Sequence, residues 1–166
     1  FVAITHSFGA MHALRHSPPG CRGLVAVNGF DSFVAGPGRA GVPPRLLDRM
    51  IARFADEPHG VLADFRHRCE VDGAFPALHA ERLGRDLLAM RDMDCAADAG
   101  RWQAPILILQ GALDPILPAG MRDSVFAAAP QVERATHPAG GHMLPLTAPD
   151  WCAQRIATFL QACDER

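Results

Sequence analysis

Lysine is absent from this sequence, and all 16 of its Lys and Arg positions hold arginine. A chain without lysine has neither the Schiff-base lysine of imine-forming enzymes nor the phosphate-binding lysine of a P-loop, so both classes are excluded. No apolar run approaches the roughly 20 residues that a membrane-spanning helix needs, so we expect no membrane segment. The formal net charge of −2 gives no electrostatic reason to expect binding to nucleic acid.

Metal-binding and disulfide motifs are also lacking. The 5 cysteines are widely scattered, and no C-x-x-C pair occurs among them. An odd number of scattered cysteines predicts neither a zinc knuckle nor a disulfide framework, so we expect no metal and a reducing, cytoplasmic environment. The chain begins without methionine at Phe1, inside a strand-like run, and we therefore expect a fragment that lacks N-terminal strands.

Apolar runs and helical patterns alternate along much of the chain, whose 166 residues suit a single domain with a substantial core. Short apolar runs of strand character occur at residues 1–5, 24–27 and 105–110, and we expect a further short strand near residues 132–135. Helical patterns connect them, and this alternation predicts an α/β fold with a mainly parallel sheet flanked by helices.

The middle of the chain has a different character. A linker rich in glycine and proline is followed by three helical patterns with no strand between them. We therefore expect two core segments, residues 1–31 and residues 101–166, and an inserted helical lid over residues 32–100. The alternative is a helical subdomain with no gating role.

The opening stretch, Phe1–Leu14, predicts a strand, an abrupt turn at Ser7 and a helix. A serine on such a strained turn projects its hydroxyl above the sheet, provided that the residues two positions before and after it are small. Gly9 meets this requirement, whereas Thr5 does not meet it as well. Ser7 is a candidate nucleophile on this ground, and the alternative is that it only caps the helix.

Asp114 and His142 follow the later strands, so the chain carries a serine, an acid and a histidine in that order. A serine hydroxyl needs a base within hydrogen-bond reach, and that base needs an orienting carboxylate. Because the carboxyl ends of parallel strands meet at one crevice, we predict that Ser7, Asp114 and His142 form a catalytic triad.

Two competitors for these roles stay open. Asp31 follows the second strand and could hold the orienting carboxylate in place of Asp114. His137 could replace His142 as the base, although two glycines before His142 give its loop the backbone freedom that a positioned histidine needs.

Residues around the predicted nucleophile complete the expected site. The backbone N–H of Phe8 should supply one donor of an oxyanion hole, and we expect the second donor from a segment before Phe1. We further expect His6, Phe30 and Phe33 to contact the substrate.

Together these residues resemble the α/β-hydrolase superfamily from its nucleophile strand onward. Within it, the chain is most similar to the pimeloyl-carrier-protein methyl ester carboxylesterases of biotin biosynthesis and their relatives. That similarity is carried by Arg49–Phe54 (RMIARF), Leu107–Asp114 (LILQGALD) and Gly141-His142 before Pro145.

The resemblance implies a serine esterase that cleaves a carboxylic ester through an acyl-enzyme and needs no cofactor. It makes Ser7 the nucleophile, Asp114 the acid and His142 the base. Other hydrolases of the same fold, which cleave carbon–carbon bonds, lactones or thioesters, are alternatives. A non-catalytic ligand-binding protein or an inert truncated homologue is an alternative of another class.

An arginine stripe bears on the partner. Arg45, Arg49 and Arg53 recur at helical spacing and so share one face of a predicted helix, and Arg66 and Arg68 follow on the next. An acidic acyl-carrier protein could dock on this stripe through charge-assisted contacts. The alternative is a solvated surface without a partner.

Overall fold

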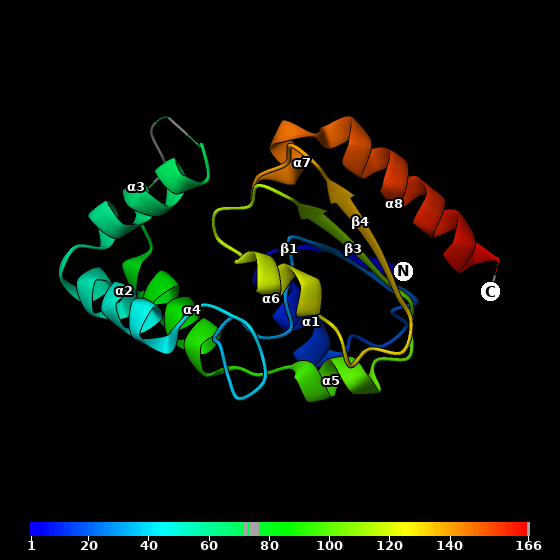
Figure 1. Cartoon of the computed structure of the whole chain (residues 1–166), viewed down its shortest axis with the longest axis horizontal. Coiled ribbons are helices and arrows are strands. Elements are labelled where there is room, and N and C mark those ends of the chain that lie inside the picture. The colour runs from blue at the N-terminus through cyan, green and yellow to red at the C-terminus, as the bar shows by residue number, and fades with distance from the viewer. Residues whose placement is uncertain (72, 74–76, 166) are drawn as a thin grey trace.

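The computed structural model of the chain describes residues 1–71, 73 and 77–165. Residues 72 and 74–76, within the expected helical insertion, and residue 166, within the second expected core segment, lie outside the described part. Four strands form one parallel sheet in chain order (Figure 1): β1 (Val2–His6), β2 (Gly23–Val27), β3 (Ile106–Gly111) and β4 (Val132–His137). The α/β class and the parallel sheet predicted from the sequence are confirmed.

Apolar residues explain why the two central strands lie in the middle of the sheet. Every residue of β2 and of β3 is buried, as expected for parallel strands that are covered on both faces. Alternate side chains of these strands point to opposite faces, so Leu24 and Ile106 enter one core cluster while Val25 and Leu107 enter the other.

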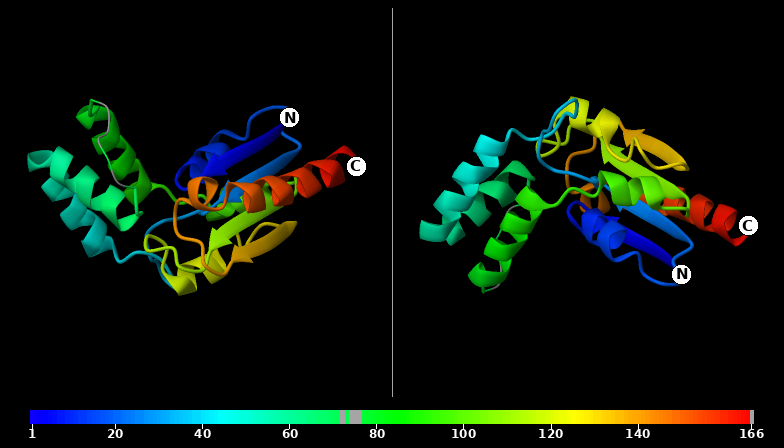
Figure 2. Two further views of the ribbon diagram at one scale, coloured as in Figure 1. Left: turned by 90° about the horizontal axis from the view of Figure 1, so that it is seen from above. Right: turned by 90° about the horizontal axis from the view of Figure 1, so that it is seen from below.

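Helices cover both faces of the sheet. One face carries α1 (Gly9–His16), α5 (Ala96–Arg101) and α6 (Ala119–Ser124), and the other carries α7 (Leu144–Thr147) and α8 (Pro149–Asp164). Figure 2 shows α8 in front of the sheet from above, and α1 and α5 in front of it from below.

Two helical details bear on the core. α6 ends at Ser124, and Phe126 after it takes a left-handed backbone conformation and buries its ring in the core. On α8 the buried residues are Cys152, Phe159 and Cys163, whereas Leu160 is 37% exposed.

Three further helices of the described residues lie between β2 and α5 and are called the helical insertion, namely α2 (Pro44–Asp56), α3 (Pro58–Arg68) and α4 (Ala80–Asp92). They lie together beyond the carboxyl ends of the strands, and α2 contacts both of its neighbours (Figures 1 and 2). The insertion therefore faces the loops that follow the strands. Across the described residues, no helix combines the length and apolar character needed to traverse a bilayer.

Candidate active site

Ser7 occupies a sharp turn between β1 and α1. Its backbone φ of 54° lies in the left-handed region, which costs a residue other than glycine on the order of 1–3 kcal/mol. The Ser7 N–H donates to the Val27 carbonyl at 2.9 Å, so the neighbouring strand holds the turn in place. The strained conformation is the one expected for a serine whose hydroxyl must project from the sheet.

Thr5 is accommodated in the turn although glycine would be smaller. A Cβ added to Gly9 would lie 3.6 Å from the Thr5 Cβ, so the two positions face each other across the turn. The Thr5 hydroxyl donates to the Val25 carbonyl at 2.9 Å. Thr5 therefore fits the turn without a clash, and its hydroxyl is satisfied by a hydrogen bond to β2.

Ser7, His142 and Asp114 form one hydrogen-bonded chain. The Ser7 hydroxyl lies 3.1 Å from His142 Nε2, and His142 Nδ1 lies 2.8 Å from Asp114 Oδ2. His142 is 1% exposed and Asp114 is 5% exposed, so little water competes for these bonds. With Nδ1 donating to the carboxylate, Nε2 is left to accept the serine proton.

Asp114 is held by the backbone of its own loop. Its second oxygen, Oδ1, accepts the N–H groups of Ile116 at 2.7 Å and Leu117 at 3.1 Å. These bonds satisfy the buried carboxylate on one side and orient Oδ2 toward the imidazole on the other. We refer to Ser7, His142 and Asp114 as the candidate triad.

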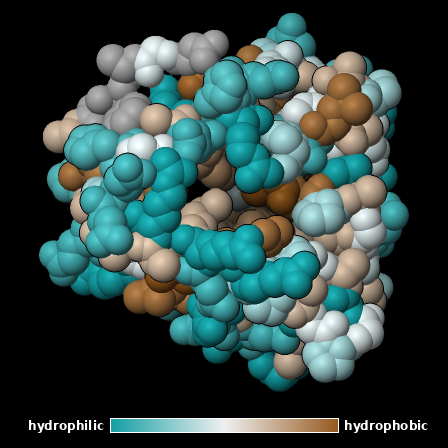
Figure 3. All heavy atoms as spheres, turned by 60° about the vertical axis from the view of Figure 1, so that its left-hand side comes forward, coloured by the Kyte–Doolittle hydropathy of each residue, from teal (hydrophilic) through white to brown (hydrophobic). Residues whose placement is uncertain are grey.

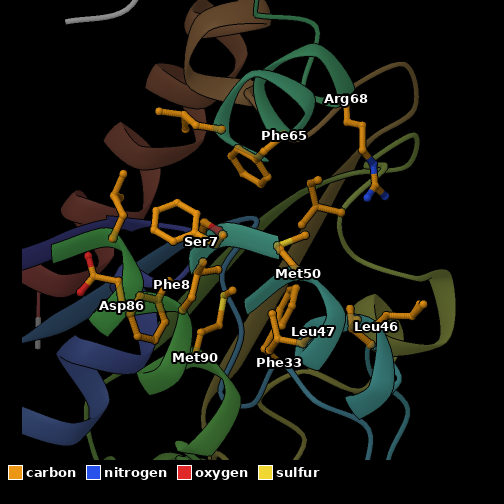
Figure 4. Close-up of a pocket in the computed structure, with 16 residues that line it drawn as sticks. Ser7, Phe8, Phe33, Leu46, Leu47, Met50, Phe65, Arg68, Asp86 and Met90 are labelled. Carbon is orange, nitrogen blue, oxygen red and sulfur yellow. The ribbon is translucent and has the colours of Figure 1, made fainter. Parts of the chain in front are cut away.

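An apolar pocket of about 400 Å³ opens onto Ser7. Its wall is built mainly by α2, α3 and α4, and its lining residues are Ser7, Phe8, Phe33, Val42, Leu46, Leu47, Met50, Phe54, Leu62, Phe65, Arg68, Leu83, Asp86, Leu87, Met90 and Ile116. Among the described residues that line it, only Arg68 and Asp86 are charged, and Figure 4 shows them on opposite sides of Ser7. On the side of the insertion, Figure 3 shows a hollow with hydrophobic residues inside it and hydrophilic residues around its rim.

The sequence profile of the alpha/beta hydrolase family matches residues 1–155. The chain belongs to this family. Among curated protein sequences, none matches the chain.

Solved structures share the fold of this α/β-hydrolase. An esterase from Exiguobacterium antarcticum has a TM-score of 0.79 at 15% identity, with 96% of this chain and 66% of that chain covered. A bromoperoxidase from Bacillus anthracis has a TM-score of 0.73 at 15% identity, with 95% of this chain and 66% of that chain covered. An esterase from Rhodococcus sp. ECU1013 has a TM-score of 0.70 at 16% identity, with 98% of this chain and 65% of that chain covered. The α/β-hydrolase chain thus spans slightly less than two thirds of the length of these proteins.

The two competitors for the triad roles lie elsewhere in the α/β-hydrolase. Asp31 is buried away from His142 and accepts a backbone hydrogen bond from Phe126, and burial raises the pKa of its carboxyl. The His137 ring packs edge-on against Trp151 with its Nδ1 buried and without a partner in the described structure. The histidine that contacts Ser7 is therefore His142, and the carboxylate that contacts His142 is that of Asp114.

Of the four residues expected beside the nucleophile, Phe8 and Phe33 line the pocket. Within the described part of the chain, no carbonyl receives the Phe8 N–H, so this donor remains available beside Ser7.

Phe30 and His6 differ from the expectation. Phe30 has no exposed surface because it packs in the core, with its ring 5.0 Å from Phe33. His6 lies outside the pocket lining, and its Nε2 lies 2.9 Å from the His142 carbonyl oxygen. Phe30 is thus a core residue, and His6 contacts the histidine loop in place of the pocket.

Several pocket residues were not expected beside the nucleophile from the sequence. The Phe65 ring on α3 stands edge-on to the His142 ring at 6.3 Å. Arg68 donates to the Pro115 carbonyl at 2.9 Å, which ties the end of α3 to the loop that carries Asp114. Helical periodicity marks the apolar face of such helices, but it cannot tell a face that packs in the core from one that lines a cavity.

The arginine stripe is divided by the structure. Arg45 and Arg49 are exposed on α2, whereas Arg53 pairs with Glu57 at 2.9 Å and also with Asp64 on α3. Arg53 is therefore engaged within the insertion.

Among the described residues, no group of three or more His, Cys, Asp or Glu side chains is arranged to hold a metal ion.

The buried carboxyl of Asp31 predicts a pH-dependent stability. Because burial raises its pKa above the ordinary value of 3.8, the folded protein binds this proton more tightly than the unfolded chain does. The resulting stabilisation is full below the ordinary pKa and is lost as the pH rises through the raised pKa. Asp31→Asn should remove this dependence and be the more stable protein near neutral pH.

Urea unfolding from about pH 4 to about pH 7 checks this expectation. The same pH dependence of the unfolding free energy in both proteins would contradict it.

Proposed function

We propose that this α/β-hydrolase is a serine esterase that cleaves a carboxylic ester through an acyl-enzyme. The observation that carries the proposal is the hydrogen-bonded candidate triad, whose serine opens into an apolar pocket. The solved structures of similar fold include two proteins described as esterases, which is in keeping with this activity.

The geometry supports the following reaction. Ser7 Oγ attacks the ester carbonyl carbon while its proton passes to His142 Nε2, and the imidazolium is stabilised by Asp114 through Nδ1–H. The carbonyl oxygen becomes an oxyanion that accepts the Phe8 N–H. Its collapse breaks the bond to the alcohol oxygen, which leaves with the proton from His142.

Deacylation repeats these steps with water. His142 takes a proton from the water as its oxygen attacks the acyl carbon, and it returns that proton to Ser7 Oγ when the acid is released. A donor such as the Phe8 N–H contributes on the order of 10²–10³ in rate, because it is aimed at the charge that develops.

The pocket supports an acyl group of several methylenes as the substrate. Thirteen of its 16 lining residues are apolar, and each buried CH₂ contributes roughly 0.8 kcal/mol to binding. As the sequence resemblance implies, the proposed natural substrate is a pimeloyl-carrier-protein methyl ester or a similar acyl ester, in the cytoplasmic synthesis of biotin. The exposed Arg45 and Arg49 are the proposed docking contacts for the acidic carrier protein.

We further propose that the helical insertion acts as a lid. Phe65 on α3 stands edge-on to the His142 ring, and Arg68 connects the same helix to Pro115 in the loop that carries Asp114. Both contacts close the pocket over the candidate triad and limit the access of water to the acyl-enzyme.

The nucleophile is tested by labelling. A fluorophosphonate probe should attach to Ser7, and Ser7→Ala should abolish labelling, whereas Ser124→Ala on α6 should label like the wild type. Peptide mass spectrometry locates the label, and a wild-type protein that does not label would refute the esterase proposal.

The acid is tested by substitution. Asp114→Asn should lower kcat about 10⁴-fold because the imidazole loses its orienting carboxylate.

The acyl pocket is tested by filling it. Met50→Trp should lower the kcat/KM ratio of p-nitrophenyl octanoate to p-nitrophenyl acetate by about tenfold or more, because the larger ring occupies space for the acyl chain. Leu88→Trp is the control, since Leu88 is 48% exposed and lies outside the pocket lining. An unchanged ratio in Met50→Trp would place the acyl group elsewhere.

The docking contacts are tested by charge reversal. The double variant Arg45→Glu, Arg49→Glu should raise KM for a carrier-bound ester by about tenfold at low salt while sparing a small free ester. Arg155→Glu on α8 provides the control on a helix outside the insertion. Equal losses on the carrier-bound and free esters would argue against docking at α2.

A further inference from the structure

Asn28 is a buried polar residue at the carboxyl end of β2 that plays no part in the reaction described above. It is 1% exposed and adopts a left-handed backbone conformation with φ of 44°. Its backbone N–H donates to the Leu109 carbonyl at 2.7 Å, which extends the pairing of β2 with β3 by one residue. Asparagine tolerates this conformation better than most residues do.

The Asn28 side chain joins the ends of three strands. Its Oδ1 accepts the Gly111 N–H at 2.9 Å, at the end of β3. Its Nδ2 donates to the Gly141 carbonyl at 3.0 Å and to the His142 carbonyl at 2.7 Å, in the loop after β4. A single amide thus connects β2, the end of β3 and the loop that carries His142.

The His142 carbonyl receives a second donor from His6. A carbonyl oxygen can only accept, so His6 Nε2 carries the hydrogen of this 2.9 Å bond. The His6 and His142 rings also pack at 4.9 Å. Burial lowers the pKa of His6 and so favours the neutral ring, whose hydrogen this bond places on Nε2.

We propose that Asn28 and His6 are positioning residues, which fix the backbone of His142 so that its imidazole stands between Ser7 and Asp114. The imidazole is bonded through both nitrogens, and the peptide behind it is bonded through its carbonyl to Asn28 and His6. This inference rests on the proposed esterase function, because it assigns a role in the same reaction.

Two Asn28 variants separate positioning from folding. Asn28→Asp keeps the side-chain shape and the acceptor for Gly111, but as a carboxylate it donates to neither carbonyl. Asn28→Gly removes the amide and suits the left-handed backbone. The matched control is Gln110→Glu, a buried amide at the end of β3 that bonds Thr136 and Arg134 and touches none of the candidate triad.

The readout is kcat for p-nitrophenyl octanoate per active site. The number of active sites is counted by titration with the fluorophosphonate probe. Both Asn28 variants should lose about 10² in kcat per labelled site with KM changed less than about threefold, because the reacting groups are misplaced and the pocket is not. A carboxylate at residue 28 should also move the acidic limb of the kcat/KM profile to higher pH, since it stabilises the imidazolium. Gln110→Glu should match the wild type.

Each remaining outcome is decisive. Wild-type kcat per labelled site in a folded Asn28 variant overturns the inference, because a merely structural residue would change only the amount of active protein. If neither Asn28 variant folds, His6→Ala decides: a kcat per site lowered about tenfold supports positioning, and an unchanged value refutes it. A wild-type protein that neither hydrolyses the ester nor labels refutes the esterase proposal itself, and the inference with it.

Discussion

The close approach of the loops after β3 and β4 is the constraint on which the candidate site depends. A Cβ at Gly111 would lie 2.2 Å from the Gly140 carbonyl oxygen and 2.6 Å from that of Gly141, so only glycine allows this contact. The Leu113 N–H then donates to the Gly140 carbonyl at 2.9 Å, which ties the acid loop to the histidine loop. The 2.8 Å bond between Asp114 and His142 exists because two backbones meet here.

The sheet and the helical insertion contribute different things to the site. The strand ends hold the candidate triad in a buried, hydrogen-bonded arrangement, whereas α2, α3 and α4 provide most of the apolar wall of the pocket. Contacts between the two parts include those of Phe65 with His142 and of Arg68 with Pro115. In the proposed reaction, the strand ends would therefore carry the chemistry and the helical insertion the selection of the acyl group.

Much of the fold could be predicted from the sequence, and so could the three residues that the structure brings together as the candidate triad. The apolar runs of β2 and β3 are unambiguous because parallel strands are buried on both faces, and their carboxyl ends mark the crevice. Asp31 and His137 could not be excluded in this way, because each also follows a strand. Their exclusion needed the hydrogen bond of the buried Asp31 to the Phe126 backbone and the packing of His137 against Trp151.

What the sequence determined by itself is the α/β class, the strained turn at Ser7 and the order of serine, acid and histidine, since strand periodicity, a glycine beside a serine and chain order are local properties. Only the tertiary structure decided that Asp114 and not Asp31 meets His142, that Phe30 belongs to the core, that Arg53 is engaged by two acids and that Asn28 bonds three strand ends. These outcomes depend on contacts between residues as much as 114 positions apart in the chain, which no local pattern encodes.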